Sequence, residues 1–305
     1  MKSIRLVPDN VNLDFLNKRY IAFIFSGLLL VLSVVSLFHQ GLNYGIDFLG
    51  GTTIEAAQSE AVDIAALRQR LGALDLGQVQ IQEFGNDKTV LIRVSAASVS
   101  QAAENELSAV EQIRNELQDF DIRRVEVVGP QISGELISTG LIAVALAIAA
   151  MLIYIWFRFE WQFGVGAVLA LVHDVALTIG VFSLLQIEFN ISILAALLTI
   201  VGYSMNDTVV VYDRVRETLR KYKKMDLIDL LNEAINSTLS RTTMTSLTTL
   251  LALVALYTLG GEVIRGFTFA MIWGIVIGTY SSIFVAAPLL VILGVKRDWS
   301  EHASS

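Results

Sequence analysis

Residues 202–217 read GYSMNDTVVVYDRVRE, and they place an ionisable carboxylate within a long apolar run. Residues 191–201 are almost all apolar, and residues 209–211 are apolar again. Asp207 therefore falls inside a predicted membrane helix, next to Asn206. An aspartate at the centre of such a helix costs roughly 2.5–3.5 kcal/mol on insertion scales. Because membrane helices keep such residues mainly where they are paired or line a polar path, Asp207 is a candidate ion-handling group.

The composition of the whole chain indicates a multi-pass membrane protein. Of its 305 residues, 54% are hydrophobic and only 17% are charged, against roughly 45–50% and 25% in soluble proteins. The chain has no cysteine, which excludes disulfides and thiolate chemistry. Its net charge is −7, and it carries no basic stripe with interleaved aromatic residues, which argues against nucleic-acid binding.

Six apolar segments are long enough to cross a bilayer, since a spanning helix needs about 20 residues. We expect these spans at residues 20–38, 137–157, 163–187, 191–211, 242–259 and 266–293. The first span is too long for a signal-peptide core and lacks a cleavage site at its end, so we expect a retained anchor.

The distribution of lysine and arginine predicts an orientation. These residues collect in segment 1–19, in the loop of residues 212–241 and in the tail of residues 294–305. We therefore expect both termini in the cytoplasm and residues 39–136 outside the inner membrane. Residues 227–239 also show an amphipathic pattern, and we expect this segment to lie along the cytoplasmic interface beside the basic residues, which anionic lipid favours.

The region between the first two spans is predicted to be a small acidic domain. Strands are expected at residues 52–57, 78–84, 89–94 and 122–128, and helices at residues 62–74 and 100–117. The order β-α-β-β-α-β is typical of ferredoxin-like domains. The absence of histidine and cysteine there favours a docking module over a catalytic one. The expected fold is thus an α-helical polytopic membrane protein with six transmembrane helices and a ferredoxin-like α+β extracytoplasmic domain.

Arg241 opens the fifth span and is the natural partner for Asp207. An Asp–Arg pair in a low-dielectric site would part when the carboxylate takes up a proton, so a proton could switch it. The alternative is that Asp207 only caps or staples neighbouring helices. Hydroxyl residues crowd the first half of the fifth span, where they serve packing or hold water: Ser240, Thr242, Thr243, Thr245, Ser246, Thr248 and Thr249.

Three other polar residues are candidate secondary relay positions. His173 and Asp174 lie near the middle of the third span, where they serve either a structural contact or a relay. Asp213 is either a relay group or part of an interfacial charge cluster. No second histidine or cysteine stands at ligand spacing, so we expect no metal and no cofactor. In the sixth span, Gly274 and Gly278 predict close helix approach.

Two motifs in their topological places resemble the SecD/SecF family of the resistance-nodulation-division superfamily. One is 202–217, and the other follows the first span as Gly45-Ile46-Asp47-Phe48-Leu49-Gly50-Gly51. The resemblance covers about residues 15–297. It implies that Asp207 and Arg241 take part in proton movement, with Asn206 beside them and a further carboxylate on SecD. It also implies that Gly45, Asp47, Gly50 and Gly51 shape the exit from the first span.

The resemblance further implies a function and a set of partners. Full units of the superfamily have twelve spans, so six spans imply a partner half, SecD. The implied role is an accessory subunit, not an enzyme, that uses the proton-motive force at late steps of preprotein translocation across the bacterial inner membrane. Implied partners are the SecYEG translocon, unfolded exported proteins and YajC. Sodium stays open as an alternative coupling ion.

Two other function classes remain to be weighed. A small-molecule exporter half of the same superfamily would carry a larger outer loop than the roughly 90 residues expected here. A non-transporting assembly factor would tolerate Asn in place of Asp207. An intramembrane hydrolase is excluded, because the spans show no nucleophile–base pair.

Overall fold

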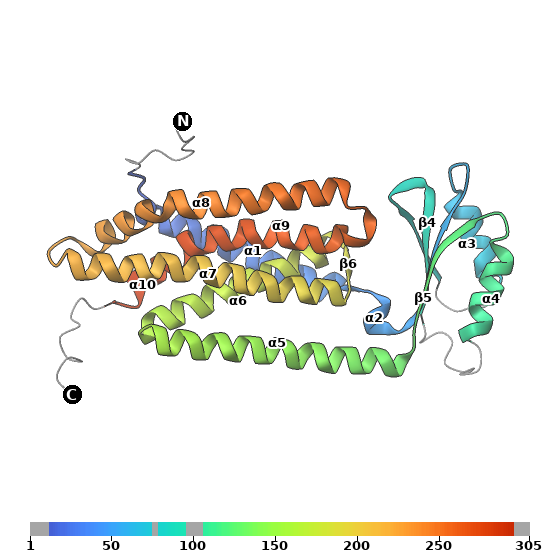
Figure 1. Cartoon of the computed structure of the whole chain (residues 1–305), viewed down its shortest axis with the longest axis horizontal. Coiled ribbons are helices and arrows are strands. Elements are labelled where there is room, and N and C mark those ends of the chain that lie inside the picture. Colours follow the sequence, from blue (N-terminus) through green and yellow to red (C-terminus); the bar gives the residue numbers. More distant parts are fainter. Residues whose placement is uncertain (1–11, 75–78, 96–105, 296–305) are drawn as a thin grey trace.

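The computed structural model describes residues 12–74, 79–95 and 106–295. Within them, six long apolar helices form a bundle, and a small α+β domain lies at one end of it (Figure 1). Each of the six is long and apolar enough to span a membrane, so the chain is a multi-pass membrane protein. The spans are α1 Arg19–Gln40, α5 Pro130–Arg158, α6 Trp161–Leu185, α7 Ile191–Lys221, α8 Leu227–Leu259 and α9 Arg265–Ser281, the last continued by a π-helical turn Ser282–Ala286 and α10 Ala287–Ile292.

The loop predicted between the fourth and fifth spans is mostly helix. α7 continues to Lys221, and α8 begins at Leu227 without a break before Leu259. The amphipathic segment of residues 227–239 is therefore the first part of the same helix that contains the fifth span. No glycine or proline interrupts this stretch, and the Asp226 carboxylate accepts a hydrogen bond from the Ile228 amide at 3.0 Å, which caps the long helix at its start.

The outer domain has the predicted order of elements. It comprises β2 Gly51–Ala57, α3 Ile64–Gly72, β3 Val79–Phe84, β4 Asn86–Ser95, α4 Glu106–Glu116 and β5 Asp121–Val128. The strands form one antiparallel sheet in the order β3-β4-β2-β5. Residues 100–105 of the predicted second helix lie outside the described residues. The core side chains come from the sheet and both helices: Ile54, Ile92, Leu67, Leu71, Ile113 and Leu117.

A short connection joins the outer domain to the bundle, and the sequence patterns did not predict it. β1 Asn43–Tyr44 pairs in parallel with β6 Glu188–Phe189, which lies between α6 and α7. The single turn α2 Ile46–Leu49 follows β1 and leads into β2. The exit from the first span is thereby hydrogen-bonded to the loop that precedes α7.

Close helix approach in the sixth span follows the predicted glycine pair. A Cβ atom built on Gly274 would lie 2.4 Å from side-chain atoms of Ile200, and one on Gly278 would lie 3.0 Å from Ser204. The small residues therefore let α9 pack directly on α7.

We predict that Gly274→Ala lowers the stability of the protein. The added methyl overlaps Ile200, and overpacking of this kind costs about 1–3 kcal/mol. Gly27→Ala in α1 is the matched control, because nothing lies within 4 Å of its Cβ position. Thermal unfolding of both variants in one detergent measures the difference. Equal unfolding temperatures would show that α7 and α9 are not closely packed.

Candidate ion-coupling site

Asp207 lies in the interior of the bundle, where three helical segments meet. Its side chain is 7% exposed. One carboxylate oxygen accepts a hydrogen bond from Thr242 Oγ1 of α8 at 2.9 Å, and the other accepts one from Ser282 Oγ at 2.5 Å. The carboxylate is thus solvated by hydroxyl donors, which is how a buried charge in a helix bundle is retained.

A π-helical turn supplies one of the two hydroxyls. Ser282 is the first residue of the turn Ser282–Ala286, which interrupts the sixth span between α9 and α10. Such turns widen the helix locally and are frequent at functional sites. Here the turn helps consecutive serines reach different carboxylates, because Ser281 donates to Asp174 while Ser282 donates to Asp207.

Arg241 and Asn206 do not contact the Asp207 carboxylate directly. The described residues form no Asp207–Arg241 ion pair within 4.0 Å, and Arg241 is exposed on α8, so its charge acts on Asp207 only from a longer distance. The hydrogen-bonding partner on α8 is the next residue, Thr242. Asn206 is also exposed, because neighbouring residues of a helix point about 100° apart. Both residues therefore lie beside the site, on the surface of the bundle.

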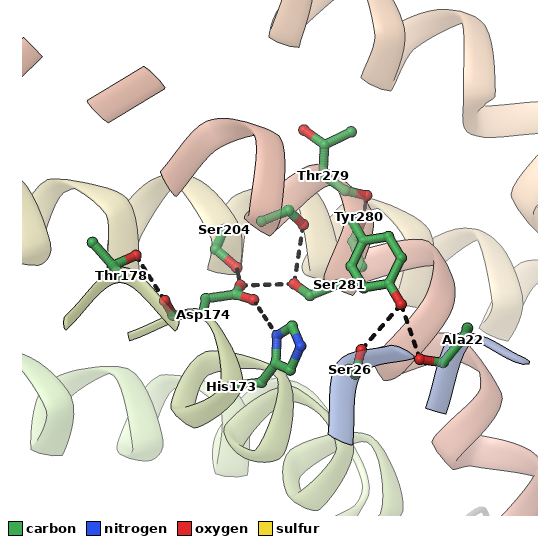
Figure 2. A network of polar contacts seen from close by, with 11 residues as sticks. Ala22, Ser26, His173, Asp174, Thr178, Ser204, Thr279, Tyr280 and Ser281 are labelled. Atoms are coloured by element: carbon green, nitrogen blue, oxygen red, sulfur yellow. Dashed lines mark hydrogen bonds and ion pairs between the residues drawn. The ribbon is translucent and has the colours of Figure 1, made fainter. Parts of the chain in front are cut away.

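A second carboxylate, that of Asp174, is buried against Ser204 and Ser281 (Figure 2). Asp174 of α6 is 0% exposed. It accepts hydrogen bonds from Ser204 Oγ at 2.5 Å and Ser281 Oγ at 2.7 Å, and it contacts His173 Nδ1 at 2.9 Å. Residues from three spans thus converge on it. His173 and Asp174, the two ionisable residues of the third span, therefore lie against the interface between α7 and α9.

Asp213 is not part of either cluster. Its carboxylate accepts from Arg158 at 2.5 Å, and both side chains are more than one-third exposed. This pair joins the end of α5 to α7 at the surface remote from the outer domain. This geometry matches one of the two interpretations of Asp213, that of an interfacial charge cluster.

The glycine motif after the first span anchors the start of α7. The Asp47 carboxylate accepts a hydrogen bond from the amide of Ile191, the first residue of α7, at 3.0 Å. The Gly45 amide donates to the Phe189 carbonyl at 2.9 Å, and a Cβ on Gly45 would lie 2.6 Å from the Glu188 carboxylate. Gly50 and Gly51 have φ of 68° and 131°, which side chains disfavour. Asp47 is therefore a cap, and the glycines permit the sharp exit.

An ion pair joins the outer domain to the same place. Arg93 of β4 is 8% exposed and is paired with Glu188 of β6. Burial raises the pKa of Glu188 above its usual range, and the Arg93 charge opposes this shift. The nearby carboxylates of Asp47 and Glu126 add to the upward shift of the Glu188 pKa.

We predict that either single substitution in this pair is costly and that the double substitution is not. Arg93→Met leaves the Glu188 carboxylate unpaired, and Glu188→Gln leaves the more deeply buried Arg93 guanidinium unpaired, so each should lower stability by about 3–5 kcal/mol. The double variant removes both charges and should recover most of that loss. Because the folded-state pKa of Glu188 is raised, its contribution to stability is present below the ordinary glutamate pKa and is lost as the pH rises through the folded value. Thermal unfolding of the wild type, the two single variants and the double variant at several pH values measures this, and a double variant as unstable as either single variant would contradict it.

The sequence patterns found the carboxylates but missed most of their partners. Thr242 is one of the seven hydroxyl residues noted in the first half of the fifth span. Three others, Thr245, Thr248 and Thr249, donate hydrogen bonds to main-chain carbonyls of their own helix. Ser281 and Ser282 read as small packing residues, and no local signal marks the π-turn. Among the described residues, no three His, Cys, Asp or Glu side chains gather in a way that could hold a metal.

Comparisons with known proteins identify relatives of the whole chain. The sequence profile described as "Protein export membrane protein SecD/SecF, C-terminal" matches residues 109–296, and "SecD/SecF GG Motif" matches residues 35–57. The protein translocase subunit SecF of Cereibacter sphaeroides is 49% identical over 304 residues, which cover 96% of this chain and 93% of the relative. That of Rickettsia bellii is 44% identical over 299 residues, which cover 96% and 97%.

Two solved structures share the fold. The crystal structure of SecDF, a translocon-associated membrane protein, from Thermus thermophilus has a TM-score of 0.84 at 36% identity and covers 96% of this chain. SecDF in its super-membrane-facing form has a TM-score of 0.71 at 36% identity. This chain spans only 40% and 42% of those two chains. From its sequence, its bundle and its glycine motif, the chain belongs to the SecD/SecF family of protein-export membrane proteins.

Proposed function

We propose that this chain pairs with SecD and uses the proton-motive force to promote late steps of preprotein translocation across the bacterial inner membrane. The observation that carries the proposal is Asp207, a carboxylate buried between α7, α8 and the π-turn, whose hydrogen-bond donors in the described part of the chain are two hydroxyl groups. Thr242 and Ser282 can rotate to donate or accept, so they can serve both the charged and the protonated carboxylate.

The geometry supports an orientation with both termini in the cytoplasm. The first turn of α1 and the end of α10 lie at the end of the bundle remote from the outer domain (Figure 1). The junctions α5–α6 and α7–α8 also lie at that end, and they carry Arg158, Arg216, Arg220, Lys221, Lys223 and Lys224. By the rule that basic loops stay inside, this end faces the cytoplasm and the α+β domain faces outward.

Polar residues on the bundle surface support a partner half. Ser192, Thr199 and Asn206 are exposed at intervals of seven along α7, and Arg241, Thr245 and Thr248 are exposed along one face of α8. Polar side chains at membrane depth are costly against lipid and stabilising against another helix. We assign these stripes to SecD, which would bring its own polar groups beside Asn206 and Arg241.

The mechanism follows from two protonation states of Asp207. When the carboxylate is ionised, Thr242 and Ser282 donate to it, and α8 and the π-turn are held against α7. When it is protonated, it must itself donate, and one of those bonds reverses. A proton crossing about 100 mV supplies about 2.3 kcal/mol, enough to bias a modest two-state equilibrium. A shift of α7 would reach the outer domain through Asp47 and the Arg93–Glu188 pair.

The remaining partners follow from the same role. An outward-facing acidic domain that moves with the bundle would hold and release unfolded exported chains beside the SecYEG translocon, with YajC as a further subunit. The chain then acts as an ion-driven translocation factor and not as an enzyme.

The proposal is tested by export in membrane vesicles that contain SecD and SecYEG. Vesicles with this chain should complete export faster when a proton gradient is imposed, and a protonophore should remove only that gain. Export that is unchanged by removing this chain, or a gain that survives the protonophore, would contradict the proposal. If export becomes faster with a sodium gradient instead, the coupling ion is sodium and not the proton.

A further inference from the structure

The buried His173–Asp174 pair is not accounted for by the site at Asp207. The Asp174 carboxylate receives three donors, two from serine hydroxyls and one from the imidazole (Figure 2). Three donors suit an ionised carboxylate, which only accepts hydrogen bonds. The ring nitrogen that faces it, His173 Nδ1, must then carry the hydrogen, so Nε2 of a neutral ring holds a lone pair.

The Nε2 lone pair is buried and accepts no hydrogen bond from the described residues. His173 is 4% exposed, and its Nε2 has no hydrogen-bond partner among the described residues. The ring stacks on Tyr280 of α9 with centroids 6.2 Å apart, and the Tyr280 hydroxyl is engaged with Ser26 and the Ala22 carbonyl of α1. Nothing described therefore competes for Nε2.

The charge balance of the pair favours proton uptake at this atom. With a neutral ring, the pair carries a net charge of about −1 in a site that excludes water, and an uncompensated buried charge is costly. One proton added to the Nε2 lone pair gives an imidazolium beside a carboxylate, which is neutral overall. Nδ1 keeps its bond to Asp174 throughout, so the proton is taken up without breaking the network.

The pair is connected to Asp207 by short structural steps. Ser281 bonds Asp174 and the adjacent Ser282 bonds Asp207, while Ser204 lies one helical turn before Asp207 on α7. The titratable groups that face the pair are Tyr280 from α9 and, across the two serines, Asp207 from α7. In its described contacts, α1 contributes only the Ser26 hydroxyl and the Ala22 carbonyl, through Tyr280.

We propose that His173 and Asp174 form a second proton-binding site, linked to Asp207 through Ser281 and Ser282 of the α9–π-turn junction. This inference rests on the proposed function for its link to export, but proton binding at His173 can be measured without it. Occupancy of one site would alter the position of the serine pair and hence the other site.

The direct test is ¹⁵N solid-state NMR of histidine in the complex with SecD in lipid, with the signal lost in His173→Gln assigned to His173. The Nε2 signal should move from its unprotonated to its protonated position as the pH of the sample is lowered from about 8 to about 5. In Asp174→Asn the protonated signal should be lost, because the buried imidazolium has no countercharge. An Nε2 signal that stays unprotonated throughout would overturn the proposal.

The functional arm compares Asp174→Asn with Thr178→Val. Thr178 is fully buried and donates to the main-chain carbonyl of Asp174 at 2.8 Å, so it shares the site without titrating. Asp174→Asn should lose gradient-dependent export while Thr178→Val retains it. Equal export by the two variants would make the pair a structural contact. If Asp207→Asn kept full gradient-dependent export, the proposed function would fail while the NMR result for His173 stood.

Discussion

Asp207→Asn removes the gradient-dependent part of protein export and leaves the gradient-independent part unchanged. Asparagine has the same shape and can still bond the hydroxyls of Thr242 and Ser282, so the bundle stays folded. It cannot take up or release a proton, so the two states of the site are lost. The expected rate with an imposed gradient is the rate that wild type shows without one.

Asp213→Asn is the matched control for this substitution. It makes the same chemical change on the same helix, but at a surface ion pair with Arg158. Exposed pairs contribute about 0–1 kcal/mol, so this variant should export like wild type. The measurement is completion of export in vesicles with SecD, with and without a gradient. Wild-type behaviour of Asp207→Asn would identify Asp207 as a structural residue and favour a scaffold role.

The second large effect is expected from removing both hydroxyls that solvate the carboxylate. Thr242→Val with Ser282→Ala leaves Asp207 buried with neither of its two described donors. An unsatisfied buried group costs about 1–3 kcal/mol, and more when it is charged. We expect a clear fall in unfolding temperature together with a loss of gradient-dependent export of about tenfold, which corresponds to about 1.4 kcal/mol.

The same interface offers a control with two other hydroxyls. Ser246 of α8 and Thr279 of α9 bond each other at 2.7 Å and touch no carboxylate in the described structure. Ser246→Ala with Thr279→Val removes a neutral pair of similar size. Removing both partners of a hydrogen bond is nearly neutral in stability. A similar loss in both double variants would show that hydroxyl packing, and not solvation of Asp207, is what matters.

The membrane spans and the elements of the outer domain could be predicted because each depends on a pattern within a short stretch of sequence. The six spans follow from continuous apolar runs, and the order of strands and helices in the outer domain follows from alternation and helical spacing. The extent of α8 could not be read from hydropathy. Its first three turns are amphipathic and its remainder is apolar, so composition changes at residue 240 while the helix continues.

The site was predictable only in part, because its partners are distant in sequence. Asp207 stands out as a charge in an apolar run, but Thr242 is 35 residues away and Ser282 is 75 residues away. The nearest obvious countercharge, Arg241, precedes the hydrogen-bonding partner Thr242 by one residue, and its side chain is exposed. Arg93 and Glu188 are 95 residues apart, and no pattern in either segment marks their contact.

Proton movement across a sealed membrane tests the central claim most directly. The complex of this chain with SecD is placed in liposomes with a pH-sensitive dye inside, and a membrane potential is imposed. Wild type and Asp213→Asn should change the internal pH at equal rates, and Asp207→Asn should be no faster than empty liposomes. Equal proton movement in wild type and Asp207→Asn would contradict the account.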